Sequence, residues 1–215
     1  MRIDENTERG EDGRLVPTPG QTIGPFFGYA TPYENVHLPW WDGQNLVPPA
    51  HPDAVRLYGT VYDGEGTPIP DAMLEIWQPD AQGRISRKDG SLVRDGFTFT
   101  GWGRSVTDNV GRYTFSTVEP GATDAERARF IHLVVFARGL LNKLHTRVYI
   151  PEDTEALAAD PFLSGLDPER RNTLIAHRDE DGSLRFDVWI QGAGENADKE
   201  TVFLQFPGIE YPVHH

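Results

Sequence analysis

From residue 55 onward the chain alternates between apolar and polar positions with a period of two. One set of alternate positions holds Val55, Leu57, Gly59 and Val61, and a turn follows at 63–66. This period is typical of a strand with one buried face. Further strand-like runs cover residues 73–77, 112–118, 129–136, 144–150, 185–190 and 201–206. Short strands separated by Gly, Pro and Asp turns predict an all-β chain folded as an antiparallel β-sandwich.

Outside these runs the pattern predicts one short helix and an extended N-terminal segment. Asp167 followed by Pro168 is typical of a helix start, so we expect a helix near 167–177. Residues 16–54 are rich in proline, glycine and aromatic side chains with little periodicity, which predicts an extended strap. The expected organisation is therefore a mobile arm (1–15), the strap (16–54), one sandwich domain (55–207) and a short C-terminal tail (208–215).

Composition narrows the function classes. A chain of 215 residues with 38% hydrophobic residues can bury one sizeable core. It has no apolar run of about 18 residues and no apolar segment at its start, so we expect a soluble, cytoplasmic protein. The net charge of -13 argues against a nucleic-acid partner. Because the chain has no cysteine, any metal would need histidine, carboxylate or tyrosine ligands.

Four motifs together indicate a family. They are 75–84 (EIWQPDAQGR), 101–113 (GWGRSVTDNVGRY), 136–139 (FARG) and 185–192 (RFDVWIQG). In this combination the chain resembles the intradiol ring-cleavage dioxygenases over residues 18–206. Within that family it is similar to the alpha subunit of a two-subunit enzyme, whose beta subunit holds the iron. The resemblance implies that both subunits share the sandwich fold.

The resemblance also implies where iron ligands would lie. In the family a ferric ion is held by two tyrosines and two histidines, and phenolate oxygen is a hard donor that favours the trivalent ion. At the matching positions this chain has Ile85, no tyrosine within 121–126, Phe130 and His132. One ligand of four is retained, so we expect no metal and no catalytic residue on this chain, and ferric iron on a beta-subunit partner. These three named residues are the vestigial ligand positions.

Other histidines and tyrosines have structural interpretations. His132 is interpreted as a hydrogen-bonded histidine of the sandwich rather than as a metal ligand. Tyr113 and Tyr149 fall inside strand patterns, so we expect them in the core or in cross-strand contacts.

Substrate-binding candidates come from the strap and from two arginines. The family resemblance implies that Thr22, Gly24, Pro25 and Phe26 form part of the wall of the partner's site, although a Gly-Pro run is also an ordinary turn. It places Arg138 close to the substrate carboxylate. A guanidinium suits that role because it is permanently charged and presents a planar fork.

Arg147 is the weaker candidate, since it is expected to face the vestigial ligand positions. For either arginine, a solvent-facing strand-end charge is the alternative.

The resulting hypothesis is a non-iron-binding alpha subunit of a dioxygenase. With its beta subunit it would cleave 3,4-dihydroxybenzoate with O2 between the two hydroxyls, giving 3-carboxy-cis,cis-muconate. An alternative is a non-catalytic, self-associating β-sandwich module that binds a small aromatic ligand. A third reading, a homomeric dioxygenase with an altered metal site, is disfavoured by the missing tyrosines.

Overall fold

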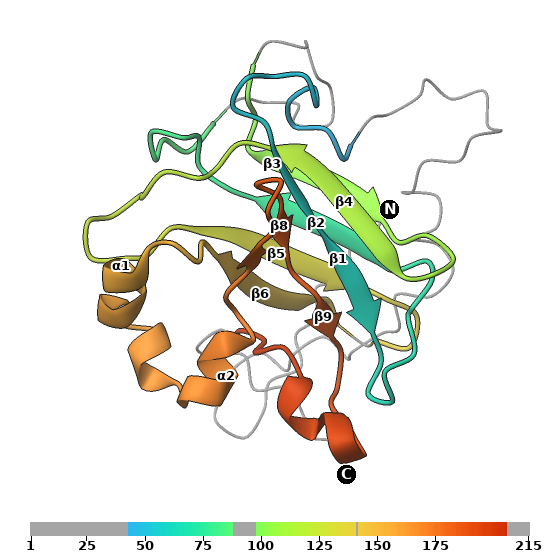
Figure 1. Ribbon diagram of the computed structural model, residues 1–215. Coiled ribbons are helices and arrows are strands. Elements are labelled where there is room, and N and C mark those ends of the chain that lie inside the picture. Colours follow the sequence, from blue (N-terminus) through green and yellow to red (C-terminus); the bar gives the residue numbers. More distant parts are fainter. Residues whose placement is uncertain (1–42, 88–97, 141, 206–215) are drawn as a thin grey trace, which may run out of the picture.

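Two sheets pack face to face in the computed structural model, which describes residues 43–87, 98–140 and 142–205 (Figure 1). The first sheet has the order β4-β1-β8-β7, with β9 also paired to β1, and the second has the order β3-β2-β5-β6. The first consists of β1 (Val55–Tyr62), β4 (Arg112–Thr117), β7 (His177–Arg178), β8 (Leu184–Arg185) and β9 (Val188–Trp189). The second consists of β2 (Met73–Trp77), β3 (Trp102–Val106), β5 (Phe130–Phe136) and β6 (Leu144–Tyr149). The predicted β-sandwich is confirmed.

The core lies between the two sheets because each strand turns alternate residues inward. Leu57 and Val61 of β1 are fully buried, and so are Ile131, Leu133 and Val135 of β5. These five side chains belong to one cluster that both sheets contribute to. Side chains of β5 between them, including Phe130 and His132, therefore lie on the outer face of the second sheet.

Three strand predictions need correction. Residues 185–190 form two short strands, β8 and β9, which run parallel to β1. At the break, a Cβ on Gly59 would lie 1.9 Å from the carbonyl oxygen of Phe186, so the two backbones approach closely. The predicted strand at 201–206 is wrong for its described part, because 201–205 has no strand assignment. Strand β3 was not predicted, since glycine and polar residues hide its alternation.

The helices are shorter and more numerous than predicted. Helix α2 (Pro168–Asn172) begins where expected, but it ends well before 177 because His177 already belongs to β7. The side chain of Asp167 makes no capping hydrogen bond. Three further elements were not predicted: α1 (Thr154–Ala159) and the 3₁₀ helices η2 (Leu163–Gly165) and η3 (Gly194–Lys199).

A second apolar cluster lies where α1 and α2 approach β6. Leu157, Leu163 and Leu174 pack with Tyr149 of β6 and Ala128 just before β5. Both helices lie at the lower left of Figure 1, on the same side of the sandwich. This packing closes the end of the second sheet where β5 begins and β6 ends.

Only the end of the strap falls within the described residues. Leu46 and Val47 are buried, and Asn45 forms a bridge with Ser116 of β4. The residues Thr22, Gly24, Pro25 and Phe26, and the arm and tail, lie outside the described residues. In the part of the chain that the structure describes, no helix is long and apolar enough to cross a membrane.

Candidate functional site

Two loops that would carry the tyrosine ligands lie against each other. The backbone N–H of Gly121 donates to the carbonyl oxygen of Asp80 over 2.8 Å. Gly83 has φ of +78°, and an added Cβ there would lie 2.0 Å from the carbonyl oxygen of Ala122. Glycine is therefore required for this close approach. Ile85 follows in the first loop with 65% of its surface exposed, so the structure pairs the loops but offers no oxygen donor at this position.

His132 lies on the outer face of β5 and pairs with another histidine. Its Nε2 is 3.0 Å from Nδ1 of His145 on β6, within hydrogen-bond distance. Burial, together with the nearby positive charges of His145, Arg147 and Lys143, lowers the pKa of His132 to about 4. Burial and Lys143 also lower the pKa of His145. The prediction of a hydrogen-bonded histidine is confirmed, whereas its partner was not identified from the sequence.

Arg147 lies directly across the ladder from His132, as its Cα partner on β6. Its guanidinium carbon is 4.3 Å from the ring centre of Phe130 and 5.1 Å from that of Phe162. Its Nη1 donates to the hydroxyl of Tyr149 over 3.0 Å. We call these four side chains the Arg147 cage. Arg147 therefore contacts Phe130 and pairs with His132, and its role at a substrate site stays a prediction.

The two tyrosines are core residues, as predicted. Tyr149 is fully buried and Tyr113 is 3% exposed. The hydroxyl of Tyr113 donates to the carbonyl oxygen of Phe186 over 2.6 Å. Burial raises the pKa of both hydroxyls. Neither is placed as a phenolate donor.

The residues at the vestigial ligand positions do not fit a ferric ion. Ile85 and Phe130 have no donor atom, and the described residues contain no group of three or more histidine, cysteine, aspartate or glutamate side chains able to hold a metal. The guanidinium of Arg147 adds a permanent positive charge beside Phe130. A hard trivalent ion needs anionic oxygen donors, which this arrangement lacks.

Arg138 occupies a separate place, on a turn after β5. The turn is closed by Leu140 N–H donating to the carbonyl oxygen of Ala137 over 3.3 Å, with Gly139 at φ of +87°. The Nε of Arg138 is 2.8 Å from Oδ2 of Asp71, and the two side chains are 66% and 47% exposed. Phe136, the last residue of β5, lies four positions beyond His132, about 13 Å along the strand, and Arg138 lies past that end. It therefore cannot serve the vestigial ligand positions of its own chain.

Asp71 is placed to meet Arg138 by the strand register. Met73 of β2 is paired with Phe136 of β5, so continuing the antiparallel ladder by two residues brings Asp71 opposite Arg138. Asp71 has φ of +61°, a conformation that aspartate tolerates better than most residues. The following residue, Ala72, donates its N–H to the buried hydroxyl of Thr107 over 2.8 Å. The turn that carries Asp71 is thus anchored to the second sheet.

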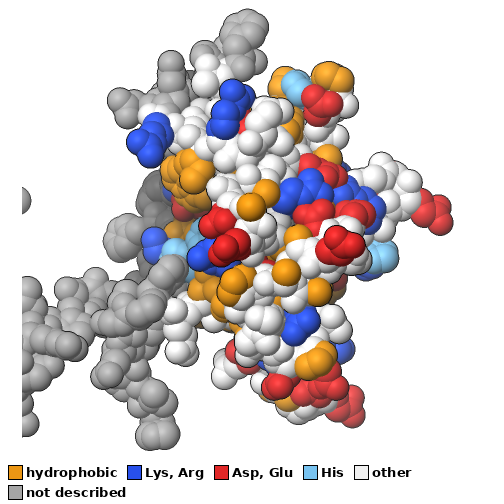
Figure 2. Space-filling model, turned by 90° about the vertical axis from the view of Figure 1, so that its left-hand side faces the viewer, with side chains coloured by type: hydrophobic (Ala, Val, Ile, Leu, Met, Phe, Trp, Pro, Cys, Tyr) orange, Lys and Arg blue, Asp and Glu red, His pale blue; other side chains and the backbone are white. Residues whose placement is uncertain are grey.

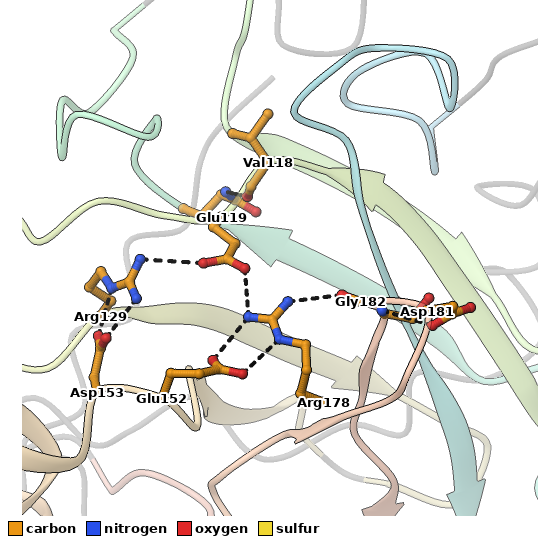
Figure 3. A network of polar contacts seen from close by, with 10 residues as sticks. Val118, Glu119, Arg129, Glu152, Asp153, Arg178, Asp181 and Gly182 are labelled. Carbon is orange, nitrogen blue, oxygen red and sulfur yellow. Dashed lines mark hydrogen bonds and ion pairs between the residues drawn. The ribbon is translucent and has the colours of Figure 1, made fainter.

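An ion-pair network joins the two sheets at the end of the sandwich, beginning at Glu119 just before the loop at 121–126 (Figure 3). The sequence did not predict it. Arg178 of β7 donates to Glu152 from Nε over 2.8 Å and from Nη2 over 3.0 Å. Its Nη2 also contacts Glu119 at 2.5 Å, and Nη1 donates to the carbonyl oxygen of Gly182 over 2.9 Å. These bonds raise the pKa of Arg178 and lower that of Glu152.

The second arginine of this network is Arg129, just before β5. It forms two bonds of 2.6 Å to Asp153 and a longer one of 3.4 Å to Glu119. Glu119 therefore joins an arginine of the first sheet to one beside the second. We call Glu119, Arg129, Glu152, Asp153 and Arg178 the end network. On the side of the molecule that carries α1, Figure 2 shows acidic and basic side chains gathered next to one another.

Comparison with known proteins gives the class to which this scaffold belongs. The Dioxygenase family model matches residues 23–192. The dioxygenase domain of a dioxygenase carbohydrate-binding protein fusion from Streptomyces sp. SirexAA-E has a similar structure, with a TM-score of 0.50 and 25% identity, covering 83% of this chain and 100% of that chain. The chain belongs to the intradiol dioxygenase family, whose members depend on iron.

Within this family the chain is similar to one kind of subunit. It is 38% identical to the protocatechuate 3,4-dioxygenase alpha chain of Burkholderia cepacia, over 88% of this chain and 98% of that one. It is also 38% identical to the alpha chain of Pseudomonas putida, over 89% of this chain and 98% of that one. Identity to the beta chain from B. cepacia is 32%, over 69% of this chain and 70% of the beta chain. The predicted resemblance to alpha subunits is confirmed.

Proposed function

We propose that this chain is the iron-free alpha subunit of a protocatechuate 3,4-dioxygenase and acts together with an iron-bearing beta subunit. The complex cleaves 3,4-dihydroxybenzoate with O2 between its two hydroxyls, and both oxygen atoms enter the product, 3-carboxy-cis,cis-muconate. One observation carries the proposal: the family scaffold and its paired loops are present, but the vestigial ligand positions hold Ile85 and Phe130, which cannot bind iron.

In this proposal the ring-opening chemistry belongs to the beta subunit, and the present chain binds and orients the substrate. Arg138 supports this role because its guanidinium is exposed on a tight turn, where a second chain can reach it. Asp71 lies 2.8 Å from the Nε of this guanidinium, whose side chain is 66% exposed. The two terminal nitrogens of a guanidinium form an edge that binds a carboxylate through two parallel hydrogen bonds. The carboxylate of 3,4-dihydroxybenzoate is the proposed ligand of that edge.

The strap has the second role in the proposal. Thr22, Gly24, Pro25 and Phe26 form part of the wall of the beta subunit's site, and the strap contacts the partner chain. The described end of the strap supports a fixed starting point, since the N–H of Leu46 donates to the carbonyl oxygen of Ser116 over 2.8 Å. Before it, the carbonyl oxygens of Gln44 and Gly43 accept the N–H groups of Ser116 and Arg104, so the described part of the strap stays bonded to the sandwich.

The role of Arg138 is tested by replacing it with glutamine in the assembled alpha-beta complex. A lost charged hydrogen bond costs about 1.5 to 3 kcal/mol. We expect the KM for 3,4-dihydroxybenzoate to rise roughly ten- to hundredfold, with a much smaller change for catechol, which has no carboxylate. Steady-state oxygen uptake measures both constants. Arg112→Gln, at an exposed position on β4, is the matched control. An equal change for the two substrates would exclude Arg138 from carboxylate binding.

A further inference from the structure

In the Arg147 cage the guanidinium has no carboxylate within ion-pair distance among the residues that the structure describes. The nearby buried carboxylate of Asp160 instead accepts the backbone N–H groups of Ala128, Phe162 and Leu163. The guanidinium lies over the rings of Phe130 and Phe162, which are negative on their faces. Aromatic rings therefore hold this cation in place of an anionic partner.

The Arg147 cage lies at the vestigial ligand positions. Phe130 is one of the vestigial ligand positions, and Arg147 is the cross-strand partner of His132, another of them. The hydrogen bond to Tyr149, on the same strand β6, and the ring of Phe162, from the segment before η2, also hold the guanidinium. A permanent charge thus lies over the ring of Phe130, on the strand next to the one that carries Phe130 and His132. Like charges repel strongly where burial reduces solvent screening.

We propose that the guanidinium of Arg147 takes the place of a metal's positive charge beside the vestigial ligand positions. It excludes iron even when metal-binding side chains are put back at Ile85 and Phe130. The lost ligands and the cation act together: Phe130 supplies a ring instead of an imidazole, and that ring holds the guanidinium. Reinstating donor side chains alone leaves a positive charge beside the new metal position. Removal of that charge is the additional step that metal binding requires.

The test compares two variants of the full chain that differ only at residue 147. The first carries Ile85→Tyr and Phe130→His, which with the native His132 supply three donors. The second carries Arg147→Gln in addition. Both are loaded with ferric iron, and bound iron per chain is measured together with the visible absorption of an iron-tyrosinate bond. We expect at least about tenfold tighter iron binding in the second variant, a difference of about 1.4 kcal/mol.

Two results would overturn the proposal: equal iron binding by both variants, or no binding by either. If the multiple substitutions prevent folding, single substitutions decide. Arg147→Gln is expected to lower the melting temperature by about 4 °C, because contacts with two rings and a hydroxyl are lost. The control Arg112→Gln changes an exposed arginine on β4. Equal melting temperatures for these two variants would show that Phe130, Phe162 and Tyr149 do not hold the Arg147 guanidinium, which the proposal requires. This test needs no beta subunit, so it is independent of the proposed function.

Discussion

Replacing Arg178 with glutamine should destabilise the sandwich by removing the centre of the end network. Arg178 contacts Glu152, Glu119 and the carbonyl oxygen of Gly182, and 23% of its side chain is exposed. Hydrogen bonds to charged groups contribute about 1.5–3 kcal/mol when buried, but solvent screening reduces this for exposed pairs. Since its two carboxylate partners are partly exposed, we expect a total loss of about 2–3 kcal/mol in the free energy of unfolding.

Thermal unfolding measures this loss directly. For a chain of 150–250 residues, 1 kcal/mol corresponds to about 2–4 °C, so the melting temperature should fall by about 5–10 °C. The matched control is Arg185→Gln, because Arg185 is 46% exposed and its Nε lies 3.8 Å from Asp179. The control should change the melting temperature by about 1 °C or less.

The pH dependence gives an independent check on the same residue. The hydrogen bond from Arg178 is the main cause of the lowered pKa of Glu152. A carboxyl whose pKa is lowered by folding contributes stability above its unfolded pKa, here 4.5, and loses it as the pH falls further. The difference in melting temperature between wild type and Arg178→Gln should therefore be largest at neutral pH and shrink below about pH 4.5. A variant that melts like wild type at neutral pH would refute the assigned role of the end network.

Two further predictions concern single positions. Folding lowers the pKa of His132 from 6.5 to about 4, so between these pH values the unfolded chain binds a proton that the folded chain does not. The free energy of unfolding should therefore fall by about 1–2 kcal/mol as the pH drops from about 6.5 to about 4. Thermal melts should show a smaller fall for His132→Gln, and an identical fall would contradict the lowered pKa of His132. Gly59→Ala should destabilise the fold by about 3 kcal/mol or more, because a Cβ would lie 1.9 Å from the carbonyl oxygen of Phe186. Chemical unfolding measures this loss. Gly182→Ala is the comparison and should cost less, because a Cβ at Gly182 meets nothing within 4 Å, although its φ is +84°.

The sequence was sufficient for the parts of the fold that depend on local alternation. Strand β1 begins at Val55, where period-two alternation starts, and β2 has the predicted bounds. Strand β3 escaped because Gly103 and Arg104 break the apolar pattern, although pairing with β2 makes it a strand. Tertiary pairing also divides the run at 185–190, since its two halves pair separately with β1.

In the candidate site, too, some features could be predicted from the sequence and others could not. Comparison of motifs was enough to identify Ile85 and Phe130 as positions without a donor atom. It could not show that Arg147 contacts Phe162, since these residues lie on different elements and no local pattern links them. The pair formed by Arg178 and Glu119, 59 positions apart, is invisible for the same reason. Long-range side-chain contacts depend on the packed fold rather than on spacing along the chain.

The most direct test of the central claim is iron content combined with oxygen uptake on 3,4-dihydroxybenzoate. Both are measured for this chain alone and after co-expression with a beta chain that has all four iron ligands. The account predicts a colourless, inactive chain alone and a red, active complex with iron in proportion to the beta chain. Stoichiometric iron in the lone chain would contradict it, and so would a stable self-associated chain that does not combine with the beta chain.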